Sequence, residues 1–338
     1  DSRVVARDDA TARLDGAKNA TFEFREIELN FNAYLNPFAR ADVFIGIHGT
    51  EGPVEVEEAS ATVLRGLPLS MQFKVGKYLL DFGKINTQHA HQWAWLEYPL
   101  MHQSFLGPEG ARVVGANLST MKPLGDNAIT LSANAFQPDF VHHHSEDEHH
   151  LAIDQEEEQN HESPVKIGFS SRLSVFRSLT DHTSFETGLC YLYAETDPQE
   201  QLARNIAAFD VKLKWRPDMY RALAWIFEAM YSDRVWIHTL EGQNDKHSAE
   251  AKGMFSALEY RFRRVYDFGV FGDYAEDAVD SDMASSAFGA FAGYMPAEET
   301  MRFSLVYRHE ESDLLAHAKN SITFQVVWAL GPHKPHSF

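Results

Sequence analysis

The chain has 338 residues, with 30 Lys and Arg against 49 Asp and Glu and a formal net charge of −19. This acidic balance argues against a nucleic-acid partner, whose binding surface would be basic. Aromatic residues make up 12% of the chain, too many for a disordered protein, and no apolar run approaches the roughly 20 residues of a membrane helix. The one cysteine, Cys190, excludes an intramolecular disulfide.

Alternating apolar and polar residues begin at Glu26 and recur almost to the end of the chain. The polar stretch before them, residues 1–20, shows at most a short strand. A period of two places one set of side chains on each face of a strand. In chain order we predict strands over residues 27–35, 41–47, 54–64, 69–75, 114–118, 129–135, 165–175, 185–193, 207–215, 223–231, 254–262, 266–274, 288–294, 301–307 and 322–330.

The hairpin of residues 204–232 shows the pattern most clearly. One face of its first strand is apolar and ends in an aromatic: Ala207, Phe209, Val211, Leu213 and Trp215. The other face is mostly charged: Ala208, Asp210, Lys212, Lys214 and Arg216. Such strands are typical of a transmembrane barrel with lipid outside and water inside. A soluble β-sandwich is the alternative, because alternation alone also describes its strands.

Connection lengths also alternate along the chain. Short connections fall near Pro37, Pro68, Leu124, Thr180, Pro217, Arg264 and Pro296, and long ones at 81–110, 137–164, 233–249, 275–283 and 309–319. Outer-membrane barrels have short periplasmic turns, long extracellular loops and, in bacterial single chains, an even number of strands. We therefore predict an all-β protein in which residues 1–338 form a single transmembrane antiparallel β-barrel of about 16 strands, or 14 as the alternative.

Residues 74–110 carry the motifs of a known family. They are Gly76-Lys77, Phe82-Gly83, Asn86, His89, His91, Glu97 before Pro99-Leu100, and Phe105-Leu106-Gly107, together with the acidic strand 54–59. The chain thereby resembles Gram-negative outer-membrane porins related to the phosphate-selective porins. That resemblance implies a 16-stranded barrel, usually trimeric, with a loop folded into the lumen. The phosphate-binding members line their pore with a ladder of basic residues, and this chain has no comparable run.

The predicted extracellular loop 137–164 is rich in histidine and acid. Imidazole suits Zn²⁺, Cu²⁺ and Ni²⁺, and carboxylates complete such ligand sets. The candidate metal ligands are His142, His143, His144, Glu146, Asp147, His149, His150 and His161. We expect a flexible metal collector, because the spacing is not that of a closed tetrahedral site. A solvated acidic loop without ligand function is the alternative.

The segment 81–110 is expected to fold into the barrel as a constriction. Its candidate residues are His89, His91, Trp93, Trp95, Glu97 and His102. His89 and His91 could pass a cation inward, but buried histidines more often only form hydrogen bonds, here from the loop to the wall. Lumen-lining charges are predicted at Asp210, Lys212, Lys214, Glu228, Glu259, Arg261 and Arg302.

Together these features predict a passive channel for small hydrophilic solutes in the Gram-negative outer membrane. The net charge predicts a preference for cations, and the histidines predict capture or uptake of zinc. The alternatives are a general or anion- or phosphate-selective porin whose histidine-rich loop takes no part in metal transport, and a non-conducting binding or adhesion barrel. No enzyme motif such as a nucleophile elbow or HExxH is visible in the sequence. We therefore expect no enzymatic activity and no required cofactor. Expected partners are membrane lipid and lipopolysaccharide, small solutes or metal ions such as Zn²⁺, and two further copies in a homotrimer.

Overall fold

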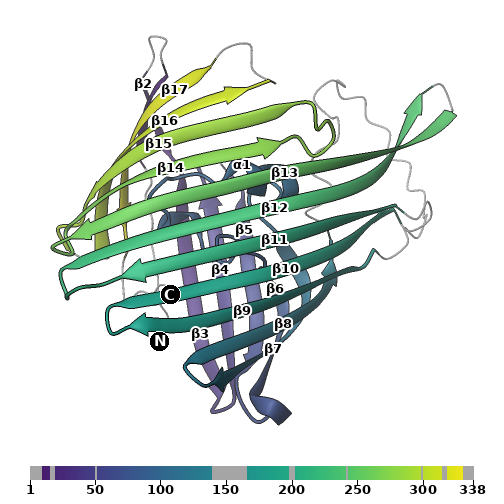
Figure 1. Cartoon of the computed structure of the whole chain (residues 1–338), viewed down its shortest axis with the longest axis horizontal. Coiled ribbons are helices and arrows are strands. Elements are labelled where there is room, and N and C mark those ends of the chain that lie inside the picture. Colours follow the sequence, from purple (N-terminus) through teal and green to yellow (C-terminus); the bar gives the residue numbers. More distant parts are fainter. Residues whose placement is uncertain are drawn as a thin grey trace.

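The computed structural model describes residues 10–15, 20–49, 52–138, 166–197, 202–240, 243–297, 300–313 and 318–329. Its strands form one antiparallel sheet of 17 segments (Figure 1). They are β1 (Ala10–Asp15), β2 (Ala20–Phe24), β3 (Glu26–Asn36), β4 (Ala39–His48), β5 (Val54–Val63), β6 (Met71–Leu79), β7 (Arg112–Leu124), β8 (Asn127–Gln137), β9 (Gly168–Thr180), β10 (Thr183–Asp197), β11 (Leu202–Trp215), β12 (Arg221–Leu240), β13 (Gln243–Phe262), β14 (Tyr266–Glu276), β15 (Ala284–Tyr294), β16 (Met301–Ser312) and β17 (Lys319–Trp328).

Sequence neighbours pair with each other from β3 through β17. At the margins, β1 pairs with β17 on one side and with β2 on the other. Only Arg25 separates β2 from β3. The first and last strands of the chain therefore lie side by side, although more than 300 residues separate them in sequence.

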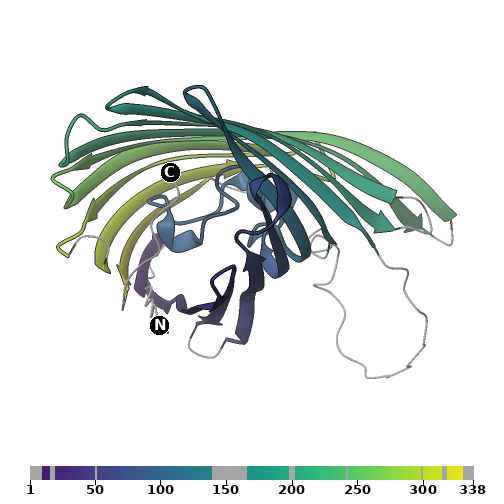
Figure 2. The same ribbon diagram turned by 90° about the horizontal axis from the view of Figure 1, so that it is seen from below.

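The sheet is strongly curved, and one long connection lies on its concave side (Figure 2). We call this connection, residues 80–111 between β6 and β7, the inner segment. It contains the 3₁₀ turn η2 (Ala90–Gln92) and the short helix α1 (Leu100–Leu106), whereas the other 3₁₀ turn, η1 (Pro68–Ser70), precedes β6. Within the described residues, no helix is both long and apolar enough to cross a membrane.

Burial in this sheet is the inverse of that in a soluble protein. On β11 and β12 the inward-facing Asp210 and Glu228 are 0% exposed, whereas the outward-facing Phe209 and Trp225 are 41% and 37% exposed. The same contrast holds on β10, where Leu189 is 59% exposed beside buried Cys190. A continuous apolar outer face of this extent is typical of a surface that meets lipid. The expected orientation of the apolar faces is thus confirmed.

The segregation of connection lengths is confirmed only in part. Two of the five predicted long connections are long, at residues 80–111 and 138–167, whereas those at 277–283 and 313–318 have seven and six residues, no more than the connection 64–70 at the other end. Short turns such as 37–38, 125–126 and 181–182 lie at one end of the sheet, which we call the turn end, and the inner segment and the β8–β9 connection leave from the opposite loop end. The prediction of a long loop over residues 233–249 is wrong. There β12 and β13 continue as paired strands to Leu240 and Gln243, and this hairpin projects beyond its neighbours (Figure 1). The charged residues Asp233 and Arg234 favour a loop in the sequence. In the structure, however, both are paired with β13 in the continuing strand ladder.

Candidate functional site

The inner segment is docked on the concave face by a layer of apolar side chains. Phe82, Ile85, Met101, Phe105 and Leu106 are all 0% exposed. They belong to one buried cluster with wall residues of β10 to β14, among them Leu192, Ile206, Met230, Phe255 and Phe271. Burying a large apolar side chain stabilises by about 1.5–3 kcal/mol. The wall behind the inner segment is therefore largely apolar, and this part of the interior is filled.

Buried polar groups fix the position of the inner segment. Glu228 on β12 accepts hydrogen bonds at Oε2 from the backbone N–H groups of Lys84 (3.0 Å) and Ile85 (3.2 Å). Its Oε1 lies 2.9 Å from Nε2 of His102, and both side chains are 0% exposed. Gly83 passes so close to Glu228 that a Cβ there would overlap the carboxylate. One side chain of the wall thus holds the inner segment at two places.

The two ends of the inner segment are tied together by Asn86. Its side-chain amide donates to the carbonyls of Leu80 (2.7 Å) and Ala111 (3.2 Å) and accepts from the N–H of Ala111 (2.8 Å). Asn86 is 0% exposed. This arrangement closes the neck of the inner segment where β6 ends and β7 begins.

The residues that were predicted to form the constriction lie in three different environments in the structure. Trp93 and His102 are fully buried between the inner segment and the wall, and the ring of Trp95 is tilted against that of Phe255 with a ring-centroid distance of 4.9 Å. Glu97 is 41% exposed, and its Oε2 lies 3.8 Å from Nε of Arg308. His91 and Trp95 border a cavity, and His89 enters an acidic cluster described below. The constriction itself stays a prediction.

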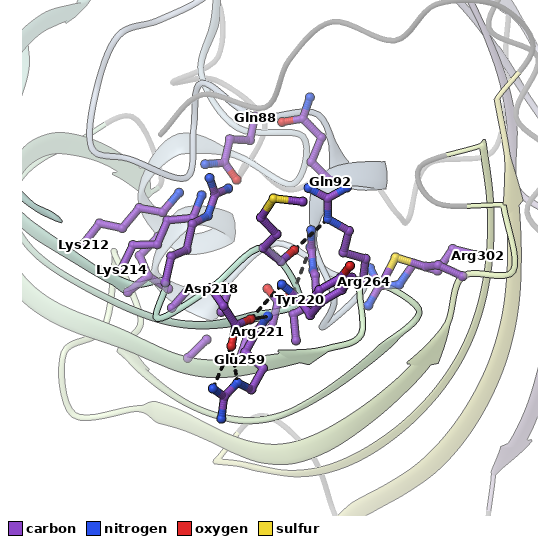
Figure 3. Close-up of a pocket in the computed structure, with 18 of the residues that line it drawn as sticks. Gln88, Gln92, Lys212, Lys214, Asp218, Tyr220, Arg221, Glu259, Arg264 and Arg302 are labelled. Atoms are coloured by element: carbon purple, nitrogen blue, oxygen red, sulfur yellow. Dashed lines mark hydrogen bonds and ion pairs between the residues drawn. The ribbon is translucent and has the colours of Figure 1, made fainter. Parts of the chain in front are cut away.

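A cavity of about 990 Å³ lies between the inner segment and the turn end. Figure 3 shows Lys212 and Lys214 on one side of it and Arg302 on the other. Seven Lys or Arg residues line it: Lys212, Lys214, Arg216, Arg221, Arg261, Arg264 and Arg302. Three acids line it: Asp181, Asp218 and Glu259. Two of the acids pair within the lining, because Asp218 lies 2.7 Å from Arg221 and Glu259 lies 3.1 Å from Arg261. The cavity therefore carries an excess of positive charge.

Five of the seven predicted lumen charges border this cavity, and two do not. Asp210 is buried in an ion pair with Arg172, with distances of 2.5 Å and 2.9 Å to its two oxygens. Glu228 holds the inner segment. Cys190 lies under that segment, where its Sγ accepts from the N–H of Gly83 (3.2 Å) and contacts Nη1 of Arg172 (3.1 Å).

An acidic cluster with histidines lies at the loop end, where the inner segment meets β3, β4 and β5. His89 contacts Glu28 through Nδ1 (2.9 Å) and Glu58 through Nε2 (2.8 Å). Burial by itself would lower the pKa of His89, but the two carboxylates raise it to about 10. His89 therefore joins the inner segment to the wall as an ion pair, which agrees with the hydrogen-bonding alternative. Glu57 completes the cluster, and its Oε2 lies 3.1 Å from Nη2 of Arg112.

Sequence reasoning missed this cluster because its members come from four separate segments. His48 was one of many scattered histidines, and Glu26, Glu28 and Glu57 were only polar positions in alternating strands. A usable signal exists: all four lie near the loop ends of three consecutive strands. The eight metal ligands predicted between His142 and His161 fall outside the described residues.

Comparison with known proteins supports the fold. No known family profile matches the chain. An uncharacterized protein of Aquifex aeolicus (strain VF5) is 24% identical over 345 residues, which cover 94% of this chain and 70% of that protein. The chain is similar to OprB of Pseudomonas putida (TM-score 0.62, 9% identity, 98% and 94% of the two chains). It is also similar to the anion-selective porin of Comamonas acidovorans (TM-score 0.57, 8% identity, 97% and 98%).

At such low identity these structures show a shared fold, which is that of outer-membrane porins. Together with the apolar outer face, this fold confirms the predicted location in the Gram-negative outer membrane.

Proposed function

We propose that the chain is a passive outer-membrane channel for small solutes that prefers anions. The barrel would close through β1, which pairs with both β17 and β2. Counting β2 and β3 as one strand interrupted at Arg25 gives the predicted 16 strands. The inner segment fills part of the interior and leaves the cavity at the turn end on the proposed path.

The observation that carries the anion preference is the lining of this cavity, with seven cationic and three acidic side chains. It favours the alternative of an anion-directed porin over the preference for cations predicted from net charge. Nine of the chain's acids lie in residues 139–165, which contain no Lys or Arg. The net charge therefore counts many acids that are not among the residues that line the cavity.

The reversal potential across a planar bilayer in a KCl gradient tests the proposal. We expect anion preference in the native chain and a shift toward cations in the double variant Lys212→Gln/Lys214→Gln. The matched control is Lys122→Gln/Lys246→Gln, which removes two exposed lysines outside the cavity lining and should leave the potential unchanged. Cation preference in the native chain would restore the original prediction, and absence of conductance would favour the binding or adhesion barrel.

A homotrimer and zinc capture by the histidine-rich tract remain part of this proposal. For the tract, comparison of zinc binding with and without residues 142–161 is the direct measurement. Neither feature is needed for the anion preference, because the cavity is lined by one chain.

A further inference from the structure

Three side chains of the acidic cluster bring metal-ligating atoms together on the wall. These atoms of Glu26, His48 and Glu57 all lie within 4.8 Å of one another. Strand pairing explains the convergence of the first two, because Glu26 on β3 is directly opposite His48 on β4. Since cross-strand partners have Cβ atoms about 5 Å apart, their side chains meet on the same face.

Glu57 joins them because of a β-bulge. Phe44 pairs with Glu58 and Ile45 pairs with Val56, so Glu57 is an extra residue in β5. A bulge re-aims a side chain, and bulges are frequent next to functional sites. Here it turns Glu57 inward, where the residue is 1% exposed.

Two of the converging atoms, Nε2 of His48 and Oε1 of Glu57, lack a hydrogen-bond partner of good geometry in the described part of the chain. The carboxyl group of Glu57 also interacts with that of Glu26 beside it. Oε1 of Glu57 faces Nε2 of His48 at 3.5 Å, while Arg112 approaches only Oε2. An unsatisfied buried polar group destabilises the folded chain, and a charged one does so more strongly. A cation between Oε1 and Nε2 would remove this destabilisation.

Gly46 leaves room for the convergence. A Cβ at this position would lie 2.4 Å from Oε1 of Glu57 and 2.8 Å from Nε2 of His48. Any other residue would therefore displace one of the two ligand atoms. The His48 side chain is 31% exposed, so the group lies close to the solvent-accessible surface of the wall.

We propose that Glu26, His48 and Glu57 bind a divalent transition-metal ion, for which Zn²⁺ is the best match. One imidazole and two carboxylates suit zinc, whereas Mg²⁺ and Ca²⁺ prefer oxygen ligands alone. Three protein ligands leave a coordination position for water or a solute. This site is separate from the histidine-rich tract and does not depend on the solute preference proposed above. It lies on the wall beside the inner segment, since Oε2 of Glu57 is 3.7 Å from Nδ1 of His89.

The test counts tightly bound zinc per chain in the full-length protein, by equilibrium dialysis against buffered Zn²⁺ with excess Mg²⁺ and elemental analysis. Because every variant keeps the tract, its contribution is constant. Glu57→Gln and His48→Gln should each bind one zinc fewer than the native chain. The matched controls are Glu55→Gln and His247→Gln, which change the same residue types at exposed positions outside the cluster and should keep the native count.

Heat-modified mobility in SDS gels shows whether each variant is folded, and if Glu57→Gln is not, the half-exposed His48→Gln decides. In crystals soaked with Zn²⁺, an anomalous peak at the zinc edge is expected between the three side chains. An unchanged zinc count in folded His48→Gln, or no peak at this position, would overturn the proposal.

Discussion

Glu228 offers the most direct test of how the inner segment is held. The variant Glu228→Ala removes two hydrogen bonds from backbone N–H groups and the contact with His102, all of them buried. Removing one partner of a buried charged pair costs about 3–5 kcal/mol, because the other groups are left unsatisfied. The loss acts on docking, since the three partners belong to the inner segment and Glu228 to the wall.

Cys190 reports this loss without a further mutation. It is the one cysteine of the chain, is 6% exposed and lies under Gly83 of the inner segment. A thiol reagent reaches it fully only when the segment lifts, so the labelling rate follows the opening equilibrium. At about 1.4 kcal/mol per factor of ten, a loss of 3–5 kcal/mol predicts labelling faster by about 10²- to 10³-fold or more.

The matched control for this experiment is Glu259→Ala. Glu259 faces inward on the neighbouring strand β13, but its partner is Arg261 on the same strand. Labelling of Cys190 in this variant should stay close to the native rate. Should Glu228→Ala label no faster than Glu259→Ala, the inner segment is not held through Glu228, and the apolar layer alone docks it.

Three further predictions follow from the same geometry. Asn86→Ala removes three hydrogen bonds at about 1 kcal/mol each and should speed hydrogen exchange across residues 80–111 but not in β9 or β10. Arg172→Ala leaves Asp210 buried without its bidentate partner, so urea unfolding should show a loss of about 3–5 kcal/mol, with Arg172→Lys between it and the native chain. The pKa of His89 is raised from 6.5 to about 10, so its ion pairs stabilise fully below pH 6.5 and are lost as pH rises toward 10. In metal-free protein, exchange at residues 88–92, corrected for intrinsic rates, should therefore be less protected at pH 10 than at pH 7, and equal protection would contradict the pairing.

The strand pattern could be predicted because a period of two is a local property. Each alternating segment has one apolar and one polar face, whatever its neighbours are. The outward orientation of Phe209 and Trp225 could therefore be predicted from the sequence. The extent of β12 and β13 could not be predicted, because pairing across the hairpin, not alternation within it, continues the strands through Asp233. The N-terminal strand β1 depends likewise on β17, which lies at the other end of the chain.

The site was predictable only in its parts. Lys212, Lys214 and Arg261 were identified as inward-facing, but their meeting with turn residues such as Arg221 around one cavity depends on curvature and register. The inward orientation of Glu57 was not predicted, for a different reason. In strict alternation its neighbour Glu58 would have the opposite orientation, yet the bulge lets both contact His89. The only trace of this bulge in the strand's sequence is a change of phase, from apolar residues at the even positions Val54 and Val56 to apolar residues at the odd positions Ala59 and Val63.

The net charge of the chain is a poor predictor of the ion preference of a channel. A permeating ion responds to charges within about a Debye length, not to a sum over 338 residues. Near the loop end it meets the carboxylates of Glu28, Glu57 and Glu58, and near the turn end it meets the cationic cavity. Arg112 and protonated His89 offset part of the acidic charge, and a divalent ion on Glu57 would offset more. In the cavity, Asp218 and Glu259 offset two of the seven cationic side chains and Asp267 offsets Arg302, which still leaves positive charge in excess. In the proposed channel this excess decides the choice between anions and cations.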